Sequence, residues 1–292
     1  MVTDRASAIA GLVTGALVWG LIWYPFRVLE QAGISGVFAT LTTYAVALAV
    51  AVLLFRRELM PLLKPDRSLL LIAASAGWCN LAYVLGMIHG QVMQVLLLFY
   101  LAPLWTLLFA RAMLDERPGA VGVLVIALSL GGAALMLWEP HLHLPIPRSA
   151  PEWLGLSSGF TFALSNVLSR RARHHSVRVK STAVFAGVVL VALLVAVLDL
   201  RAPSQWTAAG LSAPVVTLVV TLGVVLLATN VAVQHGLAVV AANQAIVIML
   251  SELLVAAVSA TLLAGEAMRW NEWAGGGMIV AASLLSGRLE RG

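Results

Sequence analysis

The sequence is poor in cysteine and in charge. It has one cysteine, Cys79, in 292 residues, so a framework of disulfide bonds is excluded. Only 11% of the residues are charged, against about 25% in an ordinary soluble domain, and 61% are hydrophobic. A mean hydropathy of +0.97 leaves too little polar surface for a soluble protein. The composition therefore predicts an integral membrane protein.

Motifs for nucleotides and metals are lacking too. The sequence contains no G-x-G-x-x-G, Walker A or C-x-x-C motif, so neither ATP nor a nucleotide cofactor is expected. Four histidines, His141, His143 and the pair His174 and His175, have no Cys or carboxylate at metal-ligand spacing beside them. We therefore expect no metal and no other cofactor, and we interpret these histidines as solvated loop residues.

Long apolar runs are what the sequence has instead. Runs of about 20 residues are long enough to cross a bilayer as helices. They cover residues 8–27, 35–55, 69–88, 92–112, 119–138, 153–172, 180–199, 213–234, 240–263 and 271–288. The first run is longer than a secretory signal, and we expect it to be retained as a helix. The predicted fold is thus an all-α integral membrane protein with ten transmembrane helices.

The basic residues predict an orientation. Of the 18 Lys and Arg residues, 14 fall in segments that share a side with the N-terminus if the ten runs all cross. The other side holds Arg27, Arg148, Arg201 and Arg269. Because Lys and Arg are concentrated in cytoplasmic loops, we expect both termini to be cytoplasmic. The same rule accounts for the basic loop from Arg170 to Lys180, so no nucleic-acid partner is expected.

An internal repeat is visible along the chain. A shift of 150 residues superposes Asn80 on Asn230, Gly86 on Gly236, Gln94 on Gln244 and Glu116 on Glu266. Because each half would hold five helices, an odd number, the second half must enter the membrane inverted. The prediction is a first repeat at residues 1–139, an external linker at 140–152 that contains four prolines, and an inverted repeat at 153–292.

These features resemble the drug/metabolite transporter superfamily, and within it the EamA-type ten-helix exporters. The resemblance covers essentially the whole chain. It is carried by the two five-helix halves, Trp19-Gly20 in the first helix, Tyr100-Leu101-Ala102-Pro103 in the fourth, and a Glu after the fourth and ninth helices. The aromatic amino acid exporters of that group carry a similar Tyr-Leu-x-Pro. One departure is Ser251-Glu252 in the ninth helix, where an aligned proline is expected.

The resemblance implies a non-enzymatic secondary transporter that moves aromatic or other neutral amino acids outward across the bacterial cytoplasmic membrane by alternating access. Proton coupling and facilitated diffusion both remain open. The first alternative is export of drugs or other metabolites. A remote one is an intramembrane hydrolase that uses Ser157, which would need an in-membrane His or Asp partner. We expect a small-molecule substrate and membrane lipid as partners, and a chain able to act as a monomer.

Glu252 is the leading candidate for a functional residue. It is the only ionisable group near the centre of any predicted span, and charged groups inside a bilayer are costly. One interpretation is a protonated Glu that hydrogen-bonds a neighbouring helix. The other is a group that exchanges protons or binds a substrate ammonium.

Other polar and aromatic residues complete the predicted cavity. They are Trp19, Asn80, Tyr83, Tyr100, Asn166, Asn230 and Gln244. The alternative for each is interhelical packing or hydrogen bonding, worth about 1 kcal/mol or less for a polar pair.

Pro103 lies inside the fourth run, where it frees the carbonyl of Phe99 and predicts a kink or a gate. The segment Gly155 to Gly159 matches the G-x-S-x-G motif of hydrolases, but we interpret it as a GxxxG contact between membrane helices.

Overall fold

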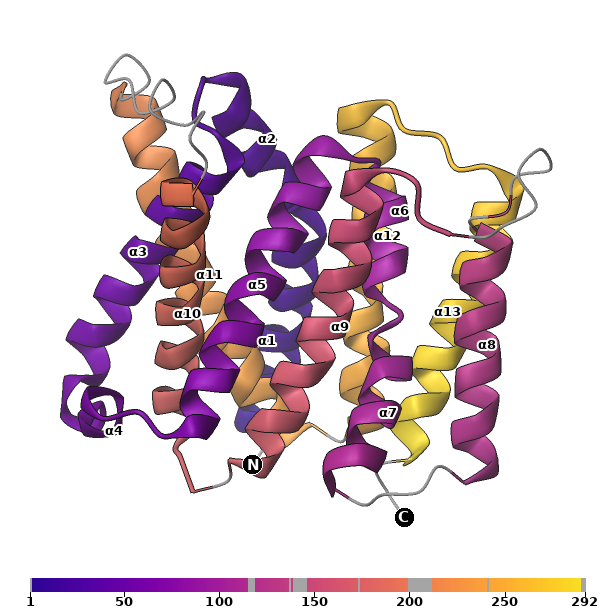
Figure 1. The fold of residues 1–292 in the computed structure, drawn as a ribbon, viewed down its shortest axis with the longest axis horizontal. Helices are drawn as coiled ribbons and strands as arrows, with labels where there is room; N and C mark the ends of the chain where they lie inside the picture. The colour runs from indigo at the N-terminus through magenta and orange to yellow at the C-terminus, as the bar shows by residue number, and fades with distance from the viewer. Residues whose placement is uncertain are drawn as a thin grey trace.

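The computed structural model describes residues 2–114, 119–136, 138, 146–172, 174–198, 212–240 and 242–289. Every regular element in these ranges is a helix (Figure 1). The elements are α1 (Val2–Leu21), α2 (Trp23–Gln31), α3 (Gly36–Phe55), η1 (Arg56–Glu58), α4 (Met60–Leu63), α5 (Arg67–His89), α6 (Val92–Phe99), α7 (Ala102–Leu114), α8 (Ala120–Met136), α9 (Ala150–Arg171), α10 (Val177–Leu198), α11 (Ala213–Val239), α12 (Ala242–Ala264) and α13 (Trp270–Leu289).

Two of the predicted runs are broken into two helices. The first run becomes α1 and α2, and the fourth becomes α6 and α7. Proline accounts for both breaks, because it has no backbone N–H to donate to the carbonyl four residues earlier. Pro25 stands in this relation to Leu21, and Pro103 stands in it to Phe99. The first break differs from the prediction of a continuous helix over 8–27.

Helix α9 begins at Ala150, inside the segment predicted as a linker. Ser149 caps the helix, because its hydroxyl accepts a hydrogen bond from the backbone N–H of Glu152 at 3.3 Å and donates one to the Glu152 side chain at 2.8 Å. Pro151 lies in the first turn, where a helix tolerates proline. The proline therefore marks the start of a helix and not a continuation of the loop.

Six helical segments among the described residues are long and apolar enough to cross a membrane. They are Arg5–Gln31, Gly36–Glu58, Arg67–His89, Val92–Met113, Val177–Leu198 and Ala213–Leu237. Shorter apolar helices cover Ala120–Leu135 and Ser251–Ala264. Large apolar side chains such as Leu53, Leu254 and Leu262 point outward, which suits a lipid environment. The count of ten crossings stays a prediction.

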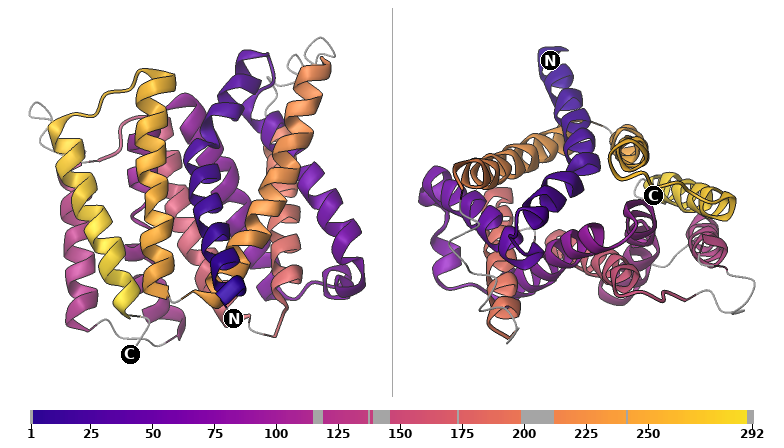
Figure 2. Two further views of the ribbon diagram at one scale, coloured as in Figure 1. Left: turned by 180° about the vertical axis from the view of Figure 1, so that it is seen from behind. Right: turned by 90° about the horizontal axis from the view of Figure 1, so that it is seen from above.

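The two ends of the bundle differ in charge. Helix α1 begins and α13 ends at the same end, which also carries α4 and the connection from α9 to α10 (Figures 1 and 2). Helix α2 and the connection from α12 to α13 lie at the opposite end (Figure 1). We call these the terminal end and the far end. Most of the basic residues lie in the segments of the terminal end, as the orientation rule requires.

The helices of the two halves pack mainly on one another. Helix α9 packs on α5, α6 and α7, while α1 packs on α11 and α12. Helix α3 packs on α10 and α11, and α10 also packs on α5. Helices α8 and α13 pair at one edge of the molecule (Figure 2). The centre of the bundle is therefore formed by α1, α5, α6, α9 and α12, which carry most of the predicted site residues.

Candidate functional site

Glu252 of α12 is buried in the protein, with 6% of its surface exposed. Its Oε2 atom accepts a hydrogen bond from the hydroxyl of Tyr100 at 3.1 Å. Tyr100 belongs to the break between α6 and α7, which Pro103 creates. The two predicted residues are thus brought together across the halves, and the non-helical backbone at Tyr100 lies inside the protein, where broken membrane helices are tolerated.

An aromatic cluster surrounds this pair. The ring of Phe99 lies 5.2 Å from that of Tyr83 and 5.8 Å from that of Tyr100, both in edge-to-face geometry. Phe162 of α9 lies 5.0 Å from Phe99 on another side. Four rings from α5, α6, the break and α9 therefore stand beside a buried carboxylate. Such a surface suits a ligand that has an apolar or aromatic body and a polar group.

The hydroxyl of Tyr83 is close to Glu252 but makes no hydrogen bond of regular geometry. The side-chain oxygen of Asn230, the ring nitrogen of Trp105 and the hydroxyl of Thr43 are buried without a partner as well. An unpaired buried polar atom costs about 1–3 kcal/mol. Two of these four groups are on predicted site residues, and each is available to pair with a ligand or a water molecule.

The remaining predicted residues do not gather at this cluster. Asn80 is occupied, because its side chain accepts from the Tyr44 hydroxyl at 2.8 Å and donates to the Ala76 carbonyl at 2.8 Å. Asn166 of α9 is exposed. Trp19 packs against a small apolar cluster between α1 and α11. The side chain of Gln244 lies outside the described residues.

Sequence reasoning missed a polar network at the far end of the bundle. Arg27 of α2 donates to the carbonyls of Met87 at 2.9 Å and Gly90 at 2.6 Å, and to the carboxylate of Glu266 at 3.2 Å. The other oxygen of Glu266 accepts from the backbone N–H of Val92, at the start of α6, at 2.7 Å. The side chains of Arg27 and Glu266 are only 19% and 16% exposed. The network ties α2, α5, α6 and the α12–α13 connection together.

A second contact reinforces this network. Gln94 of α6 donates to the buried Glu272 of α13 at 2.6 Å. The repeat alignment had singled out Gln94 and Glu266, so it was the available signal. Glu116, which the alignment pairs with Glu266, lies outside the described residues.

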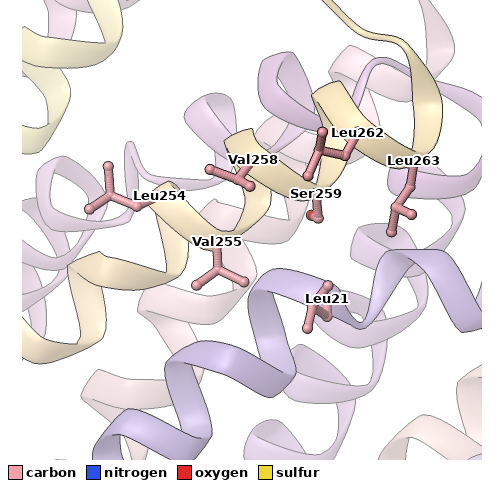
Figure 3. A pocket seen from close by; sticks show the side chains of 7 residues that line it. All are labelled: Leu21, Leu254, Val255, Val258, Ser259, Leu262 and Leu263. Carbon is pink, nitrogen blue, oxygen red and sulfur yellow. The ribbon is translucent and has the colours of Figure 1, made fainter.

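An apolar groove lies away from the aromatic cluster, between Leu21 of α1 and the last turns of α12 (Figure 3). Its volume is about 410 Å³, and its lining is apolar except for Ser259. That hydroxyl accepts a hydrogen bond from the indole of Trp23 at 3.0 Å. The groove contains none of the predicted site residues, and its lining suits lipid chains better than a polar ligand.

The segment Gly155 to Gly159 packs α9 tightly on α6. A Cβ atom at Gly159 would lie 2.4 Å from the carbonyl oxygen of Phe99, and one at Gly155 would lie 2.8 Å from that of Val95. Ser157 donates to the carbonyl of Leu154 and accepts from the indole of the exposed Trp78. These contacts are those of a helix interface, and they include none of the partners that a serine nucleophile needs.

Comparisons with known proteins identify the same family over both halves. The model of the EamA-like transporter family matches residues 6–138 and again residues 150–288. An uncharacterized transporter of Archaeoglobus fulgidus is 28% identical over 226 residues, which cover 77% of this chain and 78% of that protein. An uncharacterized transporter of Pseudomonas aeruginosa is 25% identical over 178 residues, 58% of this chain and 55% of its own length. A crystal structure with 17% identity superposes with a TM-score of 0.61 over 98% of both chains, which shows the fold alone.

Proposed function

Because the chain belongs to the EamA-like transporter family, we propose that it exports aromatic or other neutral amino acids by alternating access. Its apolar helices and its family make it a multi-pass membrane transporter. The observation that carries the substrate proposal is the buried Glu252, bonded to Tyr100 and lined by the rings of Tyr83, Phe99 and Phe162. Glu252 would bind the substrate ammonium, and the rings would cover an aromatic side chain.

We infer that the two halves are inverted repeats. The separate family matches over 6–138 and 150–288 support this inference. The packing supports it too, since α9 contacts α5 and α6 of the first half as α1 contacts α11 and α12 of the second. Gly86 and Gly236, paired by the repeat, both lie against the start of a helix of the other half, at Pro151 and Ala8 respectively. Alternating access then amounts to rocking of one half against the other.

We place the terminal end of the bundle in the cytoplasm of a bacterial cell, on the basis of its Lys and Arg residues. The network of Arg27 and Glu266 then closes the external side. Release of substrate outward requires these contacts to open, and Pro103, which ends the regular hydrogen bonding of α6, is the residue we propose as the hinge.

The test is uptake into proteoliposomes by the wild type and by Glu252→Gln, with labelled phenylalanine, leucine and alanine at several pH gradients. We expect Glu252→Gln to lower transport at least about tenfold, the effect of losing about 1.4 kcal/mol. Glu58→Gln, a change at an exposed position, is the matched control and should transport as the wild type does. Full transport by Glu252→Gln with an unchanged pH dependence would refute the role of this carboxylate.

A second candidate is export of amines that lack a carboxylate, within the wider class of drugs and metabolites. One observation favours it: among the described residues, no basic side chain forms an ion pair or a hydrogen bond with Glu252 or Tyr100. An amino acid would bring a carboxylate for which the cluster offers only neutral donors. Phenethylamine and phenylalanine differ by this carboxylate alone, so their competition for uptake decides between the two candidates.

A further inference from the structure

Two histidines and an aspartate from distant parts of the chain meet at the terminal end of the bundle. His174 and His175 lie in the connection between α9 and α10, and Asp66 directly precedes α5. The Nε2 atoms of both histidines lie 3.0 Å from the same oxygen of Asp66, Oδ2. The sequence analysis found no carboxylate near this histidine pair, because Asp66 is 108 residues away from His174.

The backbone holds the carboxylate in place. Asp66 is the N-cap of α5, and its Oδ1 atom accepts a hydrogen bond from the backbone N–H of Leu69 at 2.9 Å. This bond orients the carboxyl group so that Oδ2 faces the histidines. The backbone N–H of His175 bonds the carbonyl of Ala172, which closes the turn after α9. Hydrogen bonds that orient the ligand groups in this way are typical of metal sites.

The donor set of these side chains is that of a divalent transition metal. One ligand atom from each of Asp66, His174 and His175 lies within 4.8 Å of the others. Zinc binds imidazole nitrogen and carboxylate oxygen at about 2.0–2.2 Å, so a small inward movement of the three groups would complete three ligands. Magnesium and calcium prefer oxygen ligands, and a site with two imidazoles disfavours them. We propose that Asp66, His174 and His175 bind Zn²⁺ or a similar transition-metal ion, with water at the open position.

The charges around the cluster are compatible with a cation. Arg178 forms an ion pair with Glu58, and Lys180 donates to the carbonyl of Ser169 at 3.2 Å, so both cations are directed to other partners. The pKa of Asp66 is held below its usual value, first by the N–H of Leu69 and then by the two histidines. Asp66 is therefore ionised at neutral pH, and protonation of the imidazoles is what would expel the metal as the pH falls.

The position of the site gives it a consequence for the fold. Helix α5 belongs to the first half, and the connection of α9 to α10 belongs to the second. A metal ion would join the two halves at the terminal end, where α5 already packs on α9 and α10. The site is independent of the transport proposal, since it shares no residue with the Glu252 cluster. Movement of the halves would have to carry or break this link.

The test uses the purified full-length chain in detergent. Binding of Co²⁺, followed by its visible absorption, and of Zn²⁺, followed by calorimetry, should both give one ion per chain. Asp66→Asn keeps a residue suited to the N-cap, so the protein should fold, yet it should weaken binding about tenfold or more. His174→Ala with His175→Ala should do the same. Thermal unfolding without metal checks the folding of each variant.

The matched control is His89→Ala. His89 also contacts a carboxylate, that of Glu30 at 2.8 Å, but it lacks a second histidine. This variant should bind Zn²⁺ as the wild type does. The proposal is overturned if the wild type shows no Co²⁺ absorption and no Zn²⁺ binding beyond that of the double histidine variant. It is equally overturned if folded Asp66→Asn binds Zn²⁺ with unchanged affinity.

Discussion

At the scale of the residue, the two tyrosines beside Glu252 differ in one respect. The hydroxyl of Tyr100 bonds the carboxylate, whereas that of Tyr83 is buried without a regular partner. The first bond holds α6 and α12 together. The second hydroxyl costs stability unless it pairs with something that enters the site. This difference separates a structural from a ligand-binding role within a single cluster.

We expect Tyr100→Phe to lower the free energy of unfolding by about 1–3 kcal/mol, because Glu252 then loses its donor. Tyr83→Phe should leave stability unchanged or raise it, but should slow uptake of a substrate that bonds the hydroxyl by about tenfold. Thermal unfolding in detergent and uptake into proteoliposomes measure the two effects. A larger loss of stability in Tyr83→Phe than in Tyr100→Phe would show that the hydroxyl of Tyr83 has a structural partner.

The ion pair of Arg27 and Glu266 predicts a second contrast. Glu266→Ala removes an acceptor from Arg27 and another from the backbone N–H of Val92, so we expect a loss of about 1–3 kcal/mol in unfolding free energy. Glu58→Ala breaks an exposed pair with Arg178 and should cost about 1 kcal/mol or less. Thermal unfolding of both variants checks the difference, and equal losses would contradict a special role for the far-end network.

At the scale of the element, local rules explain where helices begin and break. Pro25 and Pro103 break helices because each leaves a carbonyl without its donor, and Pro151 starts one because the first turn needs no such donor. The sequence predicted the break at Pro103 and missed the one at Pro25. Both prolines obey the same rule, so the break before Pro25 was predictable in principle. What the rule does not say is where the freed carbonyl will point.

The carbonyl of Phe99 points at Gly159 of α9, and this contact predicts the cost of adding a methyl group. Gly159→Ala places a Cβ atom 2.4 Å from that oxygen, so α9 must move away from α6. We expect a loss of about 1–3 kcal/mol in the free energy of unfolding. The control is Gly277→Ala on α13, where a Cβ atom meets nothing within 4 Å. It should be neutral or stabilising, and thermal unfolding that ranks the two variants the other way would contradict this packing.

At the scale of the whole molecule, the bundle has a basic terminal end and a far end closed by the network of Arg27 and Glu266. The orientation follows from this asymmetry and can be measured in intact cells. With the buried Cys79 replaced by Ala, Arg148→Cys should react with a membrane-impermeant maleimide from outside. Arg57→Cys should react only after permeabilisation, which also serves as the control for both variants. Labelling of Arg57→Cys in intact cells would reverse the orientation.

The sequence by itself determined the properties that depend on a single stretch of chain. Composition and run length were enough for a membrane protein made of helices, and the position of Glu252 within an apolar run was enough to select it. The repeat could be aligned because matching residues keep their spacing within each half. These properties need no knowledge of which helix is whose neighbour.

Only the tertiary structure decided which residues meet. Glu252 pairs with Tyr100, Arg27 with Glu266, and Asp66 with a pair of histidines, all across more than 100 residues. It also placed Asn80 with Tyr44, away from the role predicted for it. In a soluble helix an apolar stripe marks the buried face, but a membrane helix is apolar all round and carries little such mark. Its neighbours are chosen by close packing of small residues such as Gly159, a property of two surfaces together that neither stretch of sequence contains alone.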